Sequence, residues 1–143
     1  MKQKLVFLTP IVLVTLLALS SCIVTSRAIG VEISCDEFTE NPYPHSIRNE
    51  FEVEIGDKIT VELCSNPTTG FEWDYEMTIE NVVKEEDHDF EPPEGDVPGA
   101  AGIEVWTFEA VEKGTTEVQM EYSQQWEGGL KAEWTYTITV AVE

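Results

Sequence analysis

Basic side chains are scarce in this sequence of 143 residues, in which 8 Lys and Arg stand against 28 Asp and Glu, a formal net charge of −20. Phosphate groups are bound by clustered Lys and Arg, so we expect no nucleic-acid partner. The excess of acidic residues is most simply explained by the solubility that it gives the protein. Attraction of a basic partner is the more specific alternative.

Histidine and cysteine are also scarce, with two and three residues. A Cys–His hydrolase would have to combine Cys64 with His45 or His88. The acidic run around His88, Glu85–Asp89, is best explained as a solvated face. It lacks the glycine and terminal glutamate of an EF-hand loop. Acidic surroundings also raise the pKa of a thiol, which disfavours a nucleophile. We therefore predict no enzyme activity, no metal and no cofactor.

Long apolar runs are limited to Val6–Leu19, about 14 residues against the roughly 20 of a membrane-spanning helix. The run follows a basic start and precedes small residues, which is typical of a secretory signal. Leu19-Ser20-Ser21-Cys22 resembles a lipoprotein lipobox. We expect cleavage of residues 1–21, lipidation of Cys22 and a tether over 22–31. A plain signal peptide or an uncleaved anchor is the alternative.

These features predict an exported protein, held in a membrane by its lipid at the cell surface or in a periplasm. In such a protein the remaining pair, Cys35 and Cys64, predicts a disulfide. The bridge would close a loop of about 30 residues and stabilise the fold by about 3.5 kcal/mol in the chain-entropy model. A reactive thiol at Cys64 is the rival interpretation.

Sustained helical periodicity is absent after residue 22, and short segments alternate apolar and polar residues instead. This period of two is typical of half-buried strands. Thr39–Asn49 contains two prolines and is expected to be an excursion. The remainder predicts an all-β, antiparallel β-sandwich of seven to eight strands over residues 32–143. The strands expected are Val31–Phe38, Phe51–Ile55, Ile59–Leu63, Phe71–Tyr75, Val82–Phe90, Trp106–Ala110, Thr116–Tyr122 and Trp134–Val142.

Three unusual connections should share one end of this sandwich. If each strand from Lys58 onward reverses the one before it, the connections Ser65–Gly70, Glu91–Gly102 and Ser123–Gly129 alternate with short, ordinary turns at the other end. Binding residues often gather on loops that a rigid scaffold supports. We therefore expect the binding surface at the end that carries the three loops.

The first of these loops has the composition of a narrow, rigid turn. Pro67 fixes φ and lacks an N–H group, and Gly70 can adopt a positive φ. Between them Thr68 and Thr69 are stiff at χ1 and expose small hydroxyl groups. We call residues 66–70 the wedge. An ordinary turn without a binding role is the alternative.

The other two loops carry a different chemistry. Gly99 and Gly102 would let the backbone approach a partner closely. Trp126, set among glutamines and glycines, is a candidate for an exposed contact, because Trp is strongly enriched at binding hot spots. Packing of Trp126 back onto the core is equally compatible with the sequence.

Together these residues resemble a known family. Asn66-Pro67-Thr68-Thr69-Gly70-Phe71, with Trp73 after it, resembles the first motif of the chagasin-like inhibitors of papain-family cysteine proteases. Gly99-Ala100-Ala101-Gly102 is similar to their second motif, Gly-x-x-Gly. Gln124-Gln125-Trp126 stands where the third motif, Arg-Pro-Trp, is expected. The order and spacing agree over about Phe51 to Val142.

The resemblance implies an immunoglobulin-like sandwich that inhibits such proteases as a monomer. The wedge would occupy the catalytic cleft, the Gly99–Gly102 loop would run along one side, and Trp126 would pack on the other. Gln124 and Gln125 replace Arg and Pro, so a positive charge and a rigid kink are missing. A surface lipoprotein with a binding or adhesion role and no protease target is the alternative function.

Overall fold

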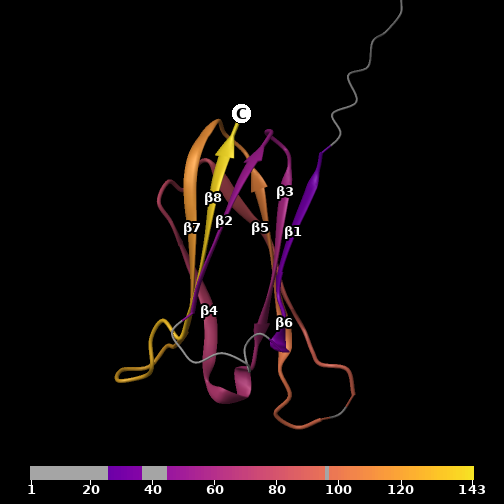
Figure 1. The fold of residues 1–143 in the computed structure, drawn as a ribbon, viewed down its shortest axis with the longest axis vertical. Coiled ribbons are helices and arrows are strands. Elements are labelled where there is room, and N and C mark those ends of the chain that lie inside the picture. Colours follow the sequence, from indigo (N-terminus) through magenta and orange to yellow (C-terminus); the bar gives the residue numbers. More distant parts are fainter. Residues whose placement is uncertain (1–25, 37–44, 96) are drawn as a thin grey trace, which may run out of the picture.

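The fold is a sandwich of two four-stranded sheets (Figure 1). The computed structural model describes residues 26–36, 45–95 and 97–143. The sheet orders are β1-β3-β6-β5 and β2-β8-β7-β4, so the all-β sandwich predicted from the sequence is confirmed. In the part of the chain that is described, no helix is long and apolar enough to cross a membrane. The strands are β1 (Ala28–Ile33), β2 (His45–Val53), β3 (Lys58–Ser65), β4 (Phe71–Met77), β5 (Val83–Glu91), β6 (Gly102–Ala110), β7 (Gly114–Gln124) and β8 (Trp134–Val142).

The N-terminal strands differ from the sequence-based prediction. The sheets are mixed rather than wholly antiparallel, because β1 pairs with β3 and β2 pairs with β8 in parallel. The predicted tether over 22–31 is too long, since β1 begins at Ala28. Likewise His45–Asn49, predicted as part of an excursion, opens β2, and residues 39–44 of that excursion lie outside the described residues. Both strands pair with partners distant in the sequence, which local patterns do not reveal.

The core follows from strict alternation in the central strands. Every second residue of β6, from Gly102 to Ala110, is buried, and the residues between them are partly exposed. The inward-facing side chains of the two sheets pack against one another in this way. Removal of their apolar surface from water is the main contribution to the stability of such a sandwich. Deep burial also raises the pKa of Tyr136 above its ordinary value. Fully buried core residues include Ile59, Val61, Leu63, Phe108, Met120, Ile138 and Val140.

The three unusual connections share one end of the sandwich, as the alternation of strand directions predicts. In Figure 1 the β3–β4, β5–β6 and β7–β8 connections all lie at the lower end, and the C-terminus lies at the upper end. Strand β1 begins beside Lys58 at the upper end and runs toward the loops, parallel to β3. The N-terminal side of the described chain is therefore remote from the three loops.

Candidate functional site

The wedge is a single 3-10 turn, Pro67–Thr69, closed by its own hydrogen bonds. The Asn66 side chain caps the turn, since its Oδ1 accepts from Thr68 N at 3.2 Å and from Thr68 Oγ1 at 2.6 Å. Thr69 Oγ1 donates to Asn66 O at 2.6 Å, and Gly70 N donates to Pro67 O at 3.0 Å. Gly70 leaves the turn with φ of 77°, a conformation that favours glycine. The predicted turn is confirmed, with both threonines exposed.

Asn66 also connects the wedge to its surroundings. Its Nδ2 donates to Gly99 O in the second loop at 2.8 Å, and its backbone N donates to the Tyr122 hydroxyl of β7 at 2.8 Å. The sequence predicted Tyr122 as the last residue of the strand Thr116–Tyr122, without a bond to the wedge. The bond could have been expected from the position of Tyr122 at the loop end of its strand, because the hydroxyl group of a buried tyrosine usually forms a hydrogen bond. Asn66 therefore fixes the wedge to the second loop and to β7.

The glycines of the second loop have different roles. Gly99 has a φ of 78°, and its carbonyl receives the bond from Asn66. Gly102 is buried at the start of β6, where a Cβ atom would lie 2.4 Å from the carbonyl oxygen of Glu91. The missing side chain of Gly102 thus serves close packing against β5, within the chain. Within the stretch Gly99–Gly102, Gly99 is exposed, and Ala100 and Ala101 are partly buried.

Gln124 ties the third loop to the wedge. Its Nε2 donates to Thr69 O at 3.3 Å, and its Oε1 accepts from Leu130 N at 3.1 Å. Its backbone N donates to Leu130 O at 2.8 Å, and its carbonyl accepts a bond from the Lys131 ammonium group. The side chain and backbone of Gln124 are therefore engaged within the chain.

Trp126 combines the two alternatives that the sequence left open. Its ring lies against Gly70, where a Cβ atom would approach Trp126 Cη2 to 2.4 Å, yet 51% of the residue stays exposed. Gln125 points elsewhere, since it lines a groove on the outer face of the β2-β8-β7-β4 sheet together with Arg48 and Thr135. The structure thus brings the wedge, Gly99, Gln124 and Trp126 together and leaves Gln125 on a different surface.

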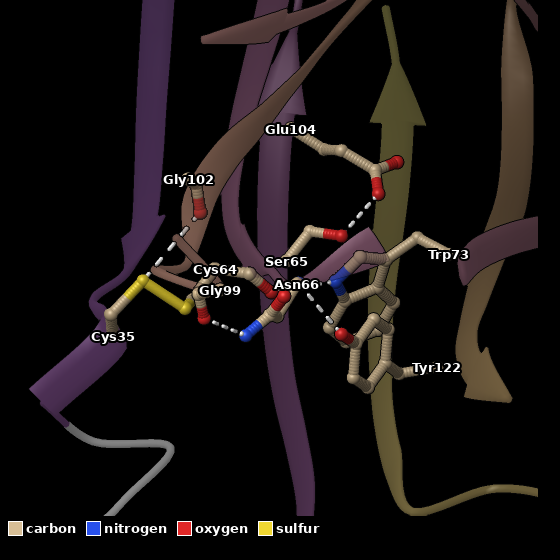
Figure 2. The surroundings of a disulfide bond; sticks show 9 residues. All are labelled: Cys35, Cys64, Ser65, Asn66, Trp73, Gly99, Gly102, Glu104 and Tyr122. Atoms are coloured by element: carbon tan, nitrogen blue, oxygen red, sulfur yellow. Dashed lines mark hydrogen bonds between the residues drawn. A yellow bond between two sulfur atoms is a disulfide. The ribbon is translucent and has the colours of Figure 1, made fainter. Parts of the chain in front are cut away.

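A disulfide braces the root of the wedge (Figure 2). Cys35, just after β1, is bonded to Cys64 near the end of β3, with the two Cα atoms 4.9 Å apart. The Cys35 sulfur lies 3.5 Å from Gly102 O, and Trp73 Nε1 donates to Cys64 O at 3.0 Å. Cys64 therefore carries no free thiol, and a hydrolase built on it would lack its nucleophile.

A buried carboxylate lies beside the same root. Ser65 Oγ donates to Glu104 Oε1 at 2.5 Å, and His88 Nε2 lies 3.1 Å from Glu104 Oε2. The His88 ring stacks on Trp106 with the ring centroids 3.4 Å apart. The run Glu85–Asp89 is exposed, as the prediction of a solvated face requires, and His88 in addition contacts Glu104 and Trp106. Because Glu104 separates the two, His88 cannot take the Ser65 proton directly, so the group lacks the geometry of a catalytic triad.

A capped turn with a loop hydrogen-bonded on each side thus lies at one end of the β-sandwich. The sequence of residues 52–140 matches the chagasin family peptidase inhibitor I42, so the chain belongs to the chagasin family of peptidase inhibitors. It is 31% identical over 80 residues to chagasin of Trypanosoma cruzi, covering 53% of this chain and 73% of chagasin. It is 26% identical over 91 residues to amoebiasin-2 of Entamoeba histolytica, covering 63% and 74% of the two chains.

Solved structures share the fold. The cysteine protease inhibitor EhICP2 of Entamoeba histolytica superposes with a TM-score of 0.59 at 21% identity, over 69% of this chain and 95% of that one. PbICP-C, solved in complex with falcipain-2, gives a TM-score of 0.56 at 11% identity, over 80% and 99% of the two chains. The immunoglobulin-like sandwich implied by the loop motifs is therefore confirmed.

Proposed function

We propose that this protein inhibits papain-family cysteine proteases by filling the catalytic cleft with the wedge. The observation that carries the proposal is the binding of the wedge to both neighbouring loops, through Asn66 to Gly99 and through Gln124 to Thr69. Three separate chain segments thus present one surface, which suits a partner with a cleft and two rims. Membership of the chagasin family supports the same function.

Resistance to cleavage would follow from the local geometry of the wedge. A protease cleaves a segment that lies extended across its catalytic groups. The wedge carbonyls of Asn66 and Pro67 instead accept bonds from Thr69 and Gly70, so the backbone stays folded as a turn. Because the turn is ordered before binding, its association costs little loop entropy. The exposed hydroxyl groups of Thr68 and Thr69 would then occupy the space beside the catalytic Cys–His pair.

The flanking loops would hold the wedge in register. The Gly99–Gly102 loop would lie along one rim and the exposed face of Trp126 would pack on the other, where an aromatic contact contributes most when water is excluded. Phe71, the first residue after the wedge, supports the turn because its ring stacks on the ring of Tyr122, with the centroids 5.1 Å apart. Gln125 would then contribute little, because it lines a groove on the outer face of a sheet.

The proposal is tested by titrating residues 26–143, with the disulfide formed, against papain and a cathepsin L-type enzyme. Hydrolysis of a small fluorogenic peptide reports the free protease, and a trypsin-like serine protease serves as the control enzyme. We expect competitive inhibition in the nanomolar range of the cysteine proteases only. Absence of inhibition at micromolar concentrations of every papain-like enzyme would contradict the proposal.

We also propose that the mature protein is an exported monomer anchored by a lipid on Cys22. The apolar run before Cys22 and a disulfide elsewhere in the chain support export. Strand β1 begins at the end opposite the three loops, so an anchor preceding it would leave the binding end free. Labelling with a fatty acid tests the anchor, and Cys22→Ala should abolish the label; retention of label by the variant would contradict it.

A further inference from the structure

Leu130 is an apolar side chain left open at the binding end. It is 56% exposed and belongs to the β7–β8 connection, which also carries Trp126 and which extends the third loop to residue 133. An isolated exposed leucine is common on protein surfaces, so exposure alone does not indicate a role. The way in which the backbone holds Leu130 is the second, independent observation.

Gln124 fixes the backbone of Leu130 from both sides. Gln124 N donates to Leu130 O at 2.8 Å, and Leu130 N donates to Gln124 Oε1 at 3.1 Å. The preceding Gly129 lies so close that a Cβ atom there would be 2.7 Å from Gln124 Cβ. Through its Nε2 the same Gln124 is bonded to Thr69 O at 3.3 Å. The position of Leu130 is therefore set relative to the wedge.

We propose that Leu130 is a second hydrophobic contact of the third loop, beside Trp126, for an apolar depression on the rim of the protease cleft. The inference deepens the proposed inhibition and rests on it. Burial of an exposed aliphatic side chain stabilises a complex in proportion to the area removed from water. The side chain is presented from a fixed backbone, so less ordering entropy opposes that gain.

Gln124 then acts as a positioning residue. Both ends of its amide and both of its backbone polar groups are already bonded to Thr69, Leu130 and Lys131. A group engaged in this way has little left to offer a partner. Gln124 thus acts as an internal clamp between the wedge and Leu130, and the contact with a partner falls to Leu130.

The first test compares Leu130→Ala with Ile79→Ala in the papain titration. Ile79 is a matched control, because it is 47% exposed, and its backbone N and O are both bonded to Thr116 Oγ1 at the end remote from the wedge. We expect Leu130→Ala to raise the inhibition constant at least tenfold and Ile79→Ala to leave it unchanged, with the same unfolding midpoint as the parent for both. An unchanged constant for Leu130→Ala would overturn the inference.

The second test is a double-mutant cycle of Gln124→Ala and Leu130→Ala. If Gln124 acts through Leu130, its substitution should weaken inhibition several-fold in the parent and distinctly less in the Leu130→Ala background. Equal effects in both backgrounds would overturn the positioning role. A parent protein that inhibits normally while Leu130→Ala has no effect refutes this inference alone. A parent that inhibits no papain-like enzyme refutes the inference and the proposed function together.

Discussion

The indole ring of Trp126 lies directly over Gly70, in the space that any side chain at position 70 would occupy. A Cβ atom on Gly70 would come within 2.4 Å of Trp126 Cη2 and 2.6 Å of Cζ3. Gly70 therefore has two functions: it accepts a positive φ where the wedge ends, and it leaves room for the aromatic ring of another loop. The relationship couples the wedge and the third loop physically.

Gly70→Ala should accordingly displace Trp126 and weaken inhibition by at least tenfold. Left-handed backbone strain alone should lower the free energy of unfolding by about 1–2 kcal/mol. Gly128→Ala is the matched control, because Gly128 has a φ of 78° and nothing lies within 4 Å of a Cβ atom there. Inhibition constants and denaturant unfolding measure the two effects. Equal losses of inhibition in both variants would show that strain, and not the Trp126 contact, is responsible.

Asn66→Ala should loosen the wedge, because the variant loses both the cap of the 3-10 turn and the bond to Gly99. Loss of such a cap costs about 1 kcal/mol. Asn66→Asp separates the two roles, since a carboxylate still accepts from Thr68 but cannot donate to Gly99 O. We expect the order of inhibition to be parent, then Asp, then Ala, by titration against papain. An alanine variant that inhibits as well as the parent would contradict the bracing role.

Much of this architecture could be predicted from the sequence. Alternation predicted the strands from Lys58 onward, and the parity of strand directions predicted that the three loops share an end. The bonds of Asn66 to Gly99 and of Gln124 to Thr69 could not be predicted, because they join segments 33 and 55 residues apart. The same limit applies to the parallel pairing of β1 and to the position of Leu130, which local sequence patterns do not encode.

Removal of the disulfide should destabilise the fold and the root of the wedge together. The chain-entropy model gives a loss of about 3.5 kcal/mol in the free energy of unfolding for a loop of this length. The double variant Cys35→Ala and Cys64→Ala should show this loss by denaturant unfolding, with weaker inhibition as a consequence. Cys64 is buried, so native protein should keep its bridge in the mild reductant that cysteine protease assays contain. A double variant as stable as the parent would refute the bracing role.

The loss of folding stability at acidic pH should depend on Asp57, which lies at the end of the sandwich opposite the three loops. Its carboxylate accepts from Glu54 N at 3.0 Å and from Arg27 N at 2.6 Å, and these backbone bonds lower the pKa of Asp57. A lowered folded-state pKa means that the stabilisation is present above about pH 4, the ordinary value for Asp, and is lost as the pH falls through the folded-state value.

Asp57→Asn should therefore be less stable than the parent at pH 7 and lose less of its stability on acidification. Unfolding curves between pH 7 and pH 2 measure this difference. Inhibition should be unchanged at neutral pH, because the substitution is remote from the three loops. The same acid dependence in parent and variant would exclude Asp57 as the responsible group.

The most direct test of occlusion by the wedge is the inhibition constant of Thr68→Arg against papain. Thr68 is exposed at the tip of the wedge, and Thr115 is exposed at the other end of the sandwich, so Thr115→Arg controls for the added charge and size. The account predicts at least a hundredfold loss of inhibition for Thr68→Arg and none for Thr115→Arg. Full inhibition by Thr68→Arg would mean that the wedge does not enter the cleft.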